Sequence, residues 1–166
     1  MAWLVAARQF AETYTHRALI TQTWDLQLDG FPAWSGLTSD GGLELPKPPL
    51  VSVTSVSYVD TAGVTQTWAA SNYTVDAPAG PWARMGRVVP GWSLYYPVAR
   101  TVPNAVTVRF VAGYGAASAV PPPIKAAMKL LIGNWWMNRE AGAIVRASAD
   151  ILPFGVDALL WPFKAF

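Results

Sequence analysis

The 166-residue sequence has no cysteine and a single histidine, His16. Without cysteine there is no disulfide, no thiol nucleophile and no cysteine-ligated zinc. A metal site at His16 would need carboxylates to complete it, and the acidic residues are scattered singly along the chain. We therefore expect no metal and no cofactor. His16 is interpreted as the end of a helix, where the helix dipole favours a positive charge.

Charged residues are also scarce, at 13% of the chain, with 12 Lys and Arg against 10 Asp and Glu. Because the positive and negative charges are nearly equal in number, the sequence does not indicate a protein that binds nucleic acid mainly by neutralising its phosphates. Four basic residues in the C-terminal half could nevertheless face DNA in a channel, although an ordinary solvated helix face is the simpler interpretation. They are Lys125, Lys129, Arg139 and Arg146.

Recognisable catalytic motifs are missing. No serine lies in a G-x-S-x-G elbow, and the G-x-G at Gly113 and Gly115 has no third glycine and no following helix signature. A carboxylate pair of the glycosidase kind remains conceivable, but single acids on strands and turns usually face solvent. The candidates are Asp25, Asp29, Glu44 and Asp60. The sequence therefore predicts a protein that is not an enzyme.

Long apolar runs of the kind that target or anchor a chain are absent as well. Residues 1–10 contain Arg8 and Gln9 where a signal peptide needs a longer apolar stretch. The most apolar helical run, residues 126–137, is interrupted by Lys129 and Asn134 and is shorter than the roughly 20 residues that cross a bilayer. We expect no contact with a membrane.

What the chain does have is apolar surface: 52% hydrophobic residues, nine tryptophans and fourteen prolines. So apolar and weakly charged a chain exposes large hydrophobic patches unless something covers them, and tryptophan is enriched where proteins bind one another. The composition favours an assembly subunit. The alternative is that tryptophan simply fills a β-rich core.

The periodicity of the apolar residues predicts an α+β fold. Residues 2–15 repeat at helical spacing, and residues 20–28, 43–45, 51–59, 64–68, 72–75, 87–89 and 105–111 read as strands, with a bulge or change of buried face between Val53 and Val56. Three prolines at 121–123 then introduce a long helix with an apolar stripe. The stripe is Ile124, Ala127, Met128, Leu131 and Trp135.

We therefore expect one domain over residues 1–150, followed by a C-terminal arm over residues 151–166. In the domain, an N-terminal helix and a second long helix at 122–142 flank an inserted antiparallel β region at 20–111. The arm is almost entirely apolar and aromatic, is broken by Pro153 and Pro162, and has room for a short helix near residues 156–161.

Four segments in this order resemble one family: Phe10 to Trp24, Leu45 to Val53, Val106 to Gly115 and the proline-led helix that follows. Each is loosely defined, but their joint order and spacing are similar to the head–tail connectors, or adaptors, of long-tailed phages and gene transfer agents. The Leu152-Pro153-Phe154 motif in the apolar arm also resembles that family.

The resemblance implies a structural subunit of the virion neck, assembled in the bacterial host cytoplasm. It implies a dodecameric ring of copies of the chain that docks on the portal protein and meets a tail-side connector or stopper protein. DNA would pass through the channel without sequence readout, and the β region would lie outside or towards the tail.

In this family the C-terminal arm reaches into the portal. By position, the contact would be carried here by Leu152, Pro153, Phe154, Trp161, Pro162 and Phe163. Three aromatic residues among those six can fill pockets on a partner. The alternative is that the arm folds back on its own subunit.

Two further expectations remain open. Relatives usually carry another helix before the one that begins here at Ala2, so either the start lies upstream of Met1 or another subunit covers the surface left bare. A different class of function, a carbohydrate-binding β module, would use exposed tryptophans that stack on sugars. Its candidates are Trp34, Trp82 and Trp92.

Overall fold

A computed structural model describes residues 2–32, 42–137 and 154–165. The chain order is α1 (Ala2–Thr15), β1 (Gln22–Leu28), β2 (Leu43–Leu45), β3 (Leu50–Val59), β4 (Thr65–Trp68), β5 (Tyr73–Asp76), β6 (Gly86–Pro90), β7 (Val106–Ala112), α2 (Pro122–Met137) and α3 (Phe154–Leu160). The predicted α+β class and each predicted helix and strand are confirmed. The predicted end of the second helix, near residue 142, lies outside the described residues.

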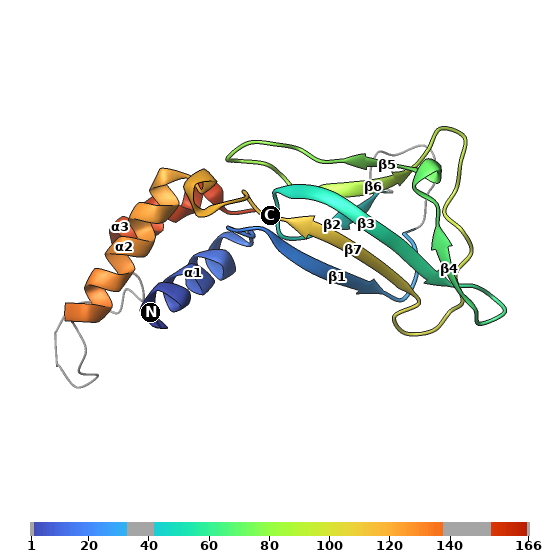
Figure 1. The fold of residues 1–166 in the computed structure, drawn as a ribbon, viewed down its shortest axis with the longest axis horizontal. Helices are drawn as coiled ribbons and strands as arrows, with labels where there is room; N and C mark the ends of the chain where they lie inside the picture. Colours follow the sequence, from blue (N-terminus) through green and yellow to red (C-terminus); the bar gives the residue numbers. More distant parts are fainter. Residues whose placement is uncertain (1, 33–41, 138–153, 166) are drawn as a thin grey trace.

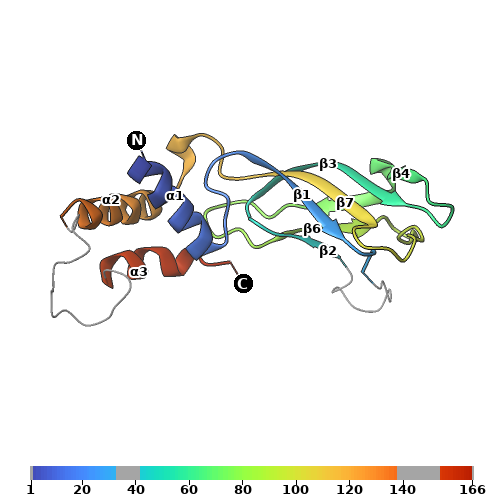
Figure 2. The same ribbon diagram turned by 90° about the horizontal axis from the view of Figure 1, so that it is seen from below.

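The molecule is elongated, with the helices at one end and the strands at the other (Figure 1). The chain enters the β region from α1, leaves it through β7 and returns to the helices, so the last described residues lie near the junction of the two parts. A second view shows α1, α2 and α3 grouped together, away from all strands (Figure 2). The strands of the inserted β region therefore pack on one another, and they do not pack across the faces of the three helices.

The β region consists of two antiparallel sheets. One has the strand order β1-β7-β3-β4 and the other β2-β6-β5. Alternate residues of β7, Val106, Val108 and Phe110, are fully buried, as the period of two in the sequence predicts. They pack in one cluster with Leu45 and Val88 of the other sheet, so the two sheets enclose a common core.

The predicted irregularity in β3 is present. The pairing of β3 with β7 shifts register between Leu50 and Ser52 and again between Val53 and Ser55. Because the side-chain period of a strand is two, each shift moves the following residues to the other face. Val56 consequently becomes fully buried, whereas Val51 stays exposed.

A second core lies among the three helices. Ala7 and Ala11 of α1 are fully buried, and so are Ile124 and Ala127 of α2. The small side chains of the three alanines let helix backbones approach closely. The predicted stripe of α2 is confirmed, with Met128 and Trp135 packed at its margin. In α1 the buried face is centred on Ala7 and Ala11, with Phe10 and Tyr14 packed beside it, while Ala6 is exposed.

Candidate assembly surface

The helical end exposes many large apolar side chains. Leu4 and Val5 of α1 are 55% and 45% exposed, and Leu130, Trp136 and Met137 of α2 are 50%, 58% and 82% exposed. Both helices thus carry apolar residues on two faces, one turned to the core and one turned outward. A helix that is apolar on its outer face marks a surface that another protein element covers.

Part of this surface is a groove of about 440 Å³ between α1 and α2. Its apolar lining includes Val5 from α1 and Met128 and Ile132 from α2, and its basic side chains are Arg8, Lys125 and Lys129. Lys125 is oriented by its own subunit, because its Nζ donates to the carbonyl oxygen of Ser118 at 3.1 Å. The groove is therefore an apolar trough flanked by cations.

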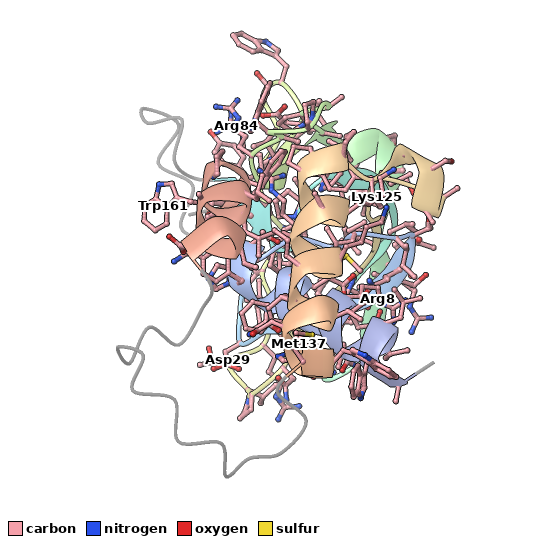
Figure 3. The ribbon with its side chains drawn as sticks, turned by 90° about the vertical axis from the view of Figure 1, so that its left-hand side faces the viewer. Arg8, Asp29, Arg84, Lys125, Met137 and Trp161 are labelled. Atoms are coloured by element: carbon pink, nitrogen blue, oxygen red, sulfur yellow. The ribbon has the colours of Figure 1, made fainter. Side chains whose placement is uncertain are left out.

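The opposite flank of the helical end is formed by α3 and the turn that follows it. Figure 3 shows Trp161 on one side of α2, with Arg8 and Lys125 on the other. Trp161 is 56% exposed, and the ammonium group of Lys164 lies 5.4 Å from the centre of its ring. The groove and the exposed indole of Trp161 thus lie on opposite sides of one helical end.

Contacts to the start of the chain fasten the C-terminal segment. Phe163 is buried in the helical core, and the Nε of Arg17 donates to its carbonyl oxygen. The backbone N–H of Ala165 donates to the carbonyl oxygen of Thr15 at 2.9 Å. Burial lowers the pKa of Arg17, and the electrostatic interaction with Tyr114 partly offsets this effect. Because the buried guanidinium of Arg17 needs a hydrogen-bond acceptor, its bond to the carbonyl oxygen of Phe163 fixes the backbone of the turn at that residue.

A second fastening joins α3 to α1. The hydroxyl of Tyr14 donates to Oδ1 of Asp157. This hydrogen bond, together with burial and the negative charge of Asp157, raises the pKa of Tyr14 to about 12. All three effects disfavour loss of the phenol proton, so the pair holds α3 in place throughout the neutral range.

The six residues predicted to contact the portal differ in their exposure in the structure. Trp161 and Pro162 are exposed, whereas Phe163 lies in the core of its own subunit. Phe154 is the first residue of α3, and Leu152 and Pro153 lie outside the described residues. The described part of the segment therefore packs on its own subunit, and Trp161 is the large aromatic group that it presents outward.

Of the four residues predicted to face a DNA channel, the structure describes two. Lys125 and Lys129 lie together on α2 beside the groove, where the structure adds Arg8 of α1. Arg139 and Arg146 lie outside the described residues. Sequence analysis missed Arg8, Leu4 and Val5 as surface residues of interest. The available signal was that Val5 and Arg8 do not share a helix face with Ala7 and Ala11.

Each of the four acidic residues considered for catalysis lies beside a structural partner in its own part of the β region. Asp25 accepts two hydrogen bonds from Arg109, at 2.8 and 2.7 Å, which lower its pKa. Asp29 accepts from the backbone N–H of Asn104 at 2.9 Å. Asp60 caps the β3–β4 turn, and its bond from Gln66 and bonds from backbone N–H groups lower its pKa. Glu44 lies opposite Arg87 across the β2–β6 pair.

Among the residues that the structure places, no three His, Asp or Glu side chains gather closely enough to hold a metal ion. None of the helices in this part of the chain has the length and hydropathy to cross a membrane.

The tryptophans considered for sugar stacking do not form one platform. Trp82 is 66% exposed but stacks against Phe163, with ring centres 6.2 Å apart. Trp92 is 97% exposed and follows the far end of β6. Five residues of extended strand, roughly 17 Å, separate the two positions. Trp34 lies outside the described residues.

Comparison with solved structures relates this fold to one kind of particle. A chain in the virion of a native gene transfer agent (GTA) particle is 29% identical, with a TM-score of 0.73 over 99% of this chain and 76% of that one. A chain in the neck of the native particle, computed with C12 symmetry, is 28% identical, with a TM-score of 0.71 over 99% and 81%. This chain shares its fold with a subunit of the GTA neck.

A third chain, in the neck of the empty GTA particle computed with C6 symmetry, gives the same result. It is 26% identical, with a TM-score of 0.75 over 99% of this chain and 77% of that chain. No family model matches the sequence, and no curated protein matches it. The resemblance to head–tail connectors that the sequence suggested is confirmed by these structures.

Proposed function

We propose that this protein is a non-enzymatic structural subunit of the neck of a phage-like particle, where copies of it form a ring between portal and tail. The observation that carries the proposal is the match to GTA neck chains, which extends over 99% of this chain and over 81% and 77% of those chains. The exposed apolar helical end supports it, because a subunit that works alone has no use for so much uncovered hydrophobic surface.

In this proposal the ring is dodecameric, in keeping with the C12 symmetry used for one of the matching necks. DNA passes through the ring without any base being read. Lys125, Lys129, Arg139 and Arg146 would then line or flank the channel, where a few positive charges attract the phosphate backbone and hold it weakly. Assembly would take place in the cytoplasm of the bacterial host, before the tail joins.

The two ends of the elongated molecule suit two different partners. We assign the portal to the helical end, with Leu152, Pro153 and Phe154 as the reaching part and Phe163 as the anchor that fixes the arm to its own subunit. The tail-side connector or stopper would meet the far end of the β region. There, Trp92, Tyr95 and Val98 are 97%, 75% and 75% exposed.

Mixing the protein with rings of the portal protein from the same particle tests this function. Electron microscopy of the mixture should show an added ring on one face of the portal. Replacing Leu152 and Phe154 together by Ser should abolish it, whereas Trp92→Ser at the opposite end should leave it unchanged. Portal rings that stay bare at high concentrations of the unmodified protein would refute the proposal.

A further inference from the structure

We infer that the groove between α1 and α2 receives Trp161 of the next copy of the chain, so that one contact, repeated head to tail, builds the ring. The inference rests on the proposed neck function and deepens it by naming the two faces of the subunit contact. It also gives Trp161 a role that differs from its predicted contact with the portal.

The groove has the size and chemistry for an aromatic side chain. Its volume of about 440 Å³ lies in the range of roughly 300–1,000 Å³ in which proteins enclose small ligands. Val5, Met128 and Ile132 supply apolar contact, and thioether sulfur packs favourably against aromatic rings. Arg8 and Lys129 at the sides can lie over an indole face as cation–π partners.

Trp161 is held in place before any partner arrives. Leu160 precedes it and is fully buried, and Phe163 follows two residues later with 5% exposure. The short 3₁₀ turn η4 (Trp161–Phe163) contains Pro162, which removes further backbone freedom. An exposed aromatic group fixed between two buried anchors loses little entropy on binding, which is the property of an interface hot spot.

The relative placement of the two surfaces selects a second copy as the occupant. Trp161 lies on one flank of the helical end, and Arg8 and Lys125 beside the groove lie on the other (Figure 3). A contact between two different faces of identical subunits leaves one of each face unused in a pair, and it closes only in a ring. The matching neck structures have cyclic symmetries, C12 and C6, which heterologous contacts of this kind generate.

Disulfide trapping tests the contact, and the chain has no cysteine of its own to interfere. Trp161→Cys and Met128→Cys are prepared as separate proteins and mixed under assembly conditions with portal rings and a mild oxidant. We expect one dominant heterodimer on a non-reducing gel, confirmed by intact mass. In the matched control, Trp92→Cys replaces Trp161→Cys, and the yield of heterodimer should fall at least about tenfold.

A second pair of variants tests the same contact without cross-linking. Trp161→Glu and Val5→Glu change exposed positions, so both proteins should fold. Each alone should fail to form rings, and an equimolar mixture should form dimers that grow no further, because one intact groove and one intact indole remain per pair. Native mass spectrometry reads out all three samples.

The outcomes separate this inference from the proposed function. If Trp161→Glu still builds rings on the portal, or if Trp161→Cys cross-links to the portal instead of to Met128→Cys, the assigned contact is wrong while the neck function stands. If the unmodified chain builds no ring on the portal, both fail.

Discussion

Two neighbouring aromatic residues illustrate what decides a side chain's role in this protein. Trp161 and Phe163 are equally apolar in sequence and were predicted to act together as portal contacts. In the structure Phe163 fills the helical core, while Trp161 is 56% exposed. The 3₁₀ geometry of η4 separates them, since residues two apart on a turn point to different sides.

This difference predicts unequal losses of stability when the two residues are replaced. Phe163→Ala should lower the free energy of unfolding by about 3 kcal/mol, because it leaves a cavity in the helical core. Trp161→Ala should lower it by no more than about 1 kcal/mol, since more than half of this side chain is exposed. Urea unfolding followed by circular dichroism measures both; equal losses would contradict the assignment of Phe163 as the anchor.

The Tyr14–Asp157 hydrogen bond gives stability a pH dependence at high pH. Because the folded protein raises the pKa of Tyr14 from 10.0 to about 12, the folded state holds this proton more tightly than the unfolded chain does. The contribution of the pair is therefore complete below pH 10 and is lost as the pH rises from about 10 to about 12. Tyr14→Phe should flatten that decline; an unchanged slope in urea unfolding between those pH values would show that the pair contributes nothing.

At the scale of elements, the end of β7 depends on one glycine. Gly113 has a φ of +126°, and a Cβ there would lie 2.2 Å from the carbonyl oxygen of Ile20. The chain crosses itself at this point as α1 leads into β1, and only glycine permits that approach. The G-x-G that sequence analysis set aside as a phosphate loop thus has a packing role.

Gly113→Ala should therefore destabilise the protein strongly, by at least about 2 kcal/mol, through both the positive φ and the clash with backbone. The matched control is Gly115→Ala, two residues later. It also has a positive φ, of +106°, but has open space where the Cβ would stand. Thermal unfolding should rank the two losses in that order, and equal shifts in Tm would show that the clash is relieved by a small movement.

A strand with strong alternation, such as β7, was predictable to within a residue or two, because burial on one face imposes a period of two. The face of α1 that packs inward was less sharply defined by the sequence. Its stripe of Ala, Leu, Val and Trp is apolar on more than one side, so the choice of Ala7 and Ala11 depended on what α2 and α3 could approach.

At the scale of the whole molecule, the two hydrophobic cores have no buried residue in common among residues 2–32, 42–137 and 154–165. The β core is closed by aromatic packing among Phe31, Trp68, Tyr73 and Tyr96. The helical core depends on α3, whose Val156 and Leu160 are fully buried. Loss of the C-terminal segment should therefore affect one end of the molecule and spare the other.

Deleting residues 152–166 should abolish much of the helical order while the β region stays folded. Far-ultraviolet circular dichroism should show a loss of helix larger than the deleted residues account for, and the near-ultraviolet signal of the aromatic β core should persist. Loss of both signals together would mean that the β region cannot fold without the helices. Because the deletion also removes core residues, point substitutions are the better probes of portal binding.

The sequence by itself determined the α+β class, the order of helices and strands, the bulge in β3 and the resemblance to head–tail connectors, because these follow from the local periodicity of apolar residues and from motifs read along the chain. Only the tertiary structure decided which apolar residues stay uncovered. It buried Phe163 and exposed Trp161, and it built a groove from α1 and α2, which are more than 100 residues apart in sequence. Exposure depends on contacts between distant segments, and no local pattern specifies them.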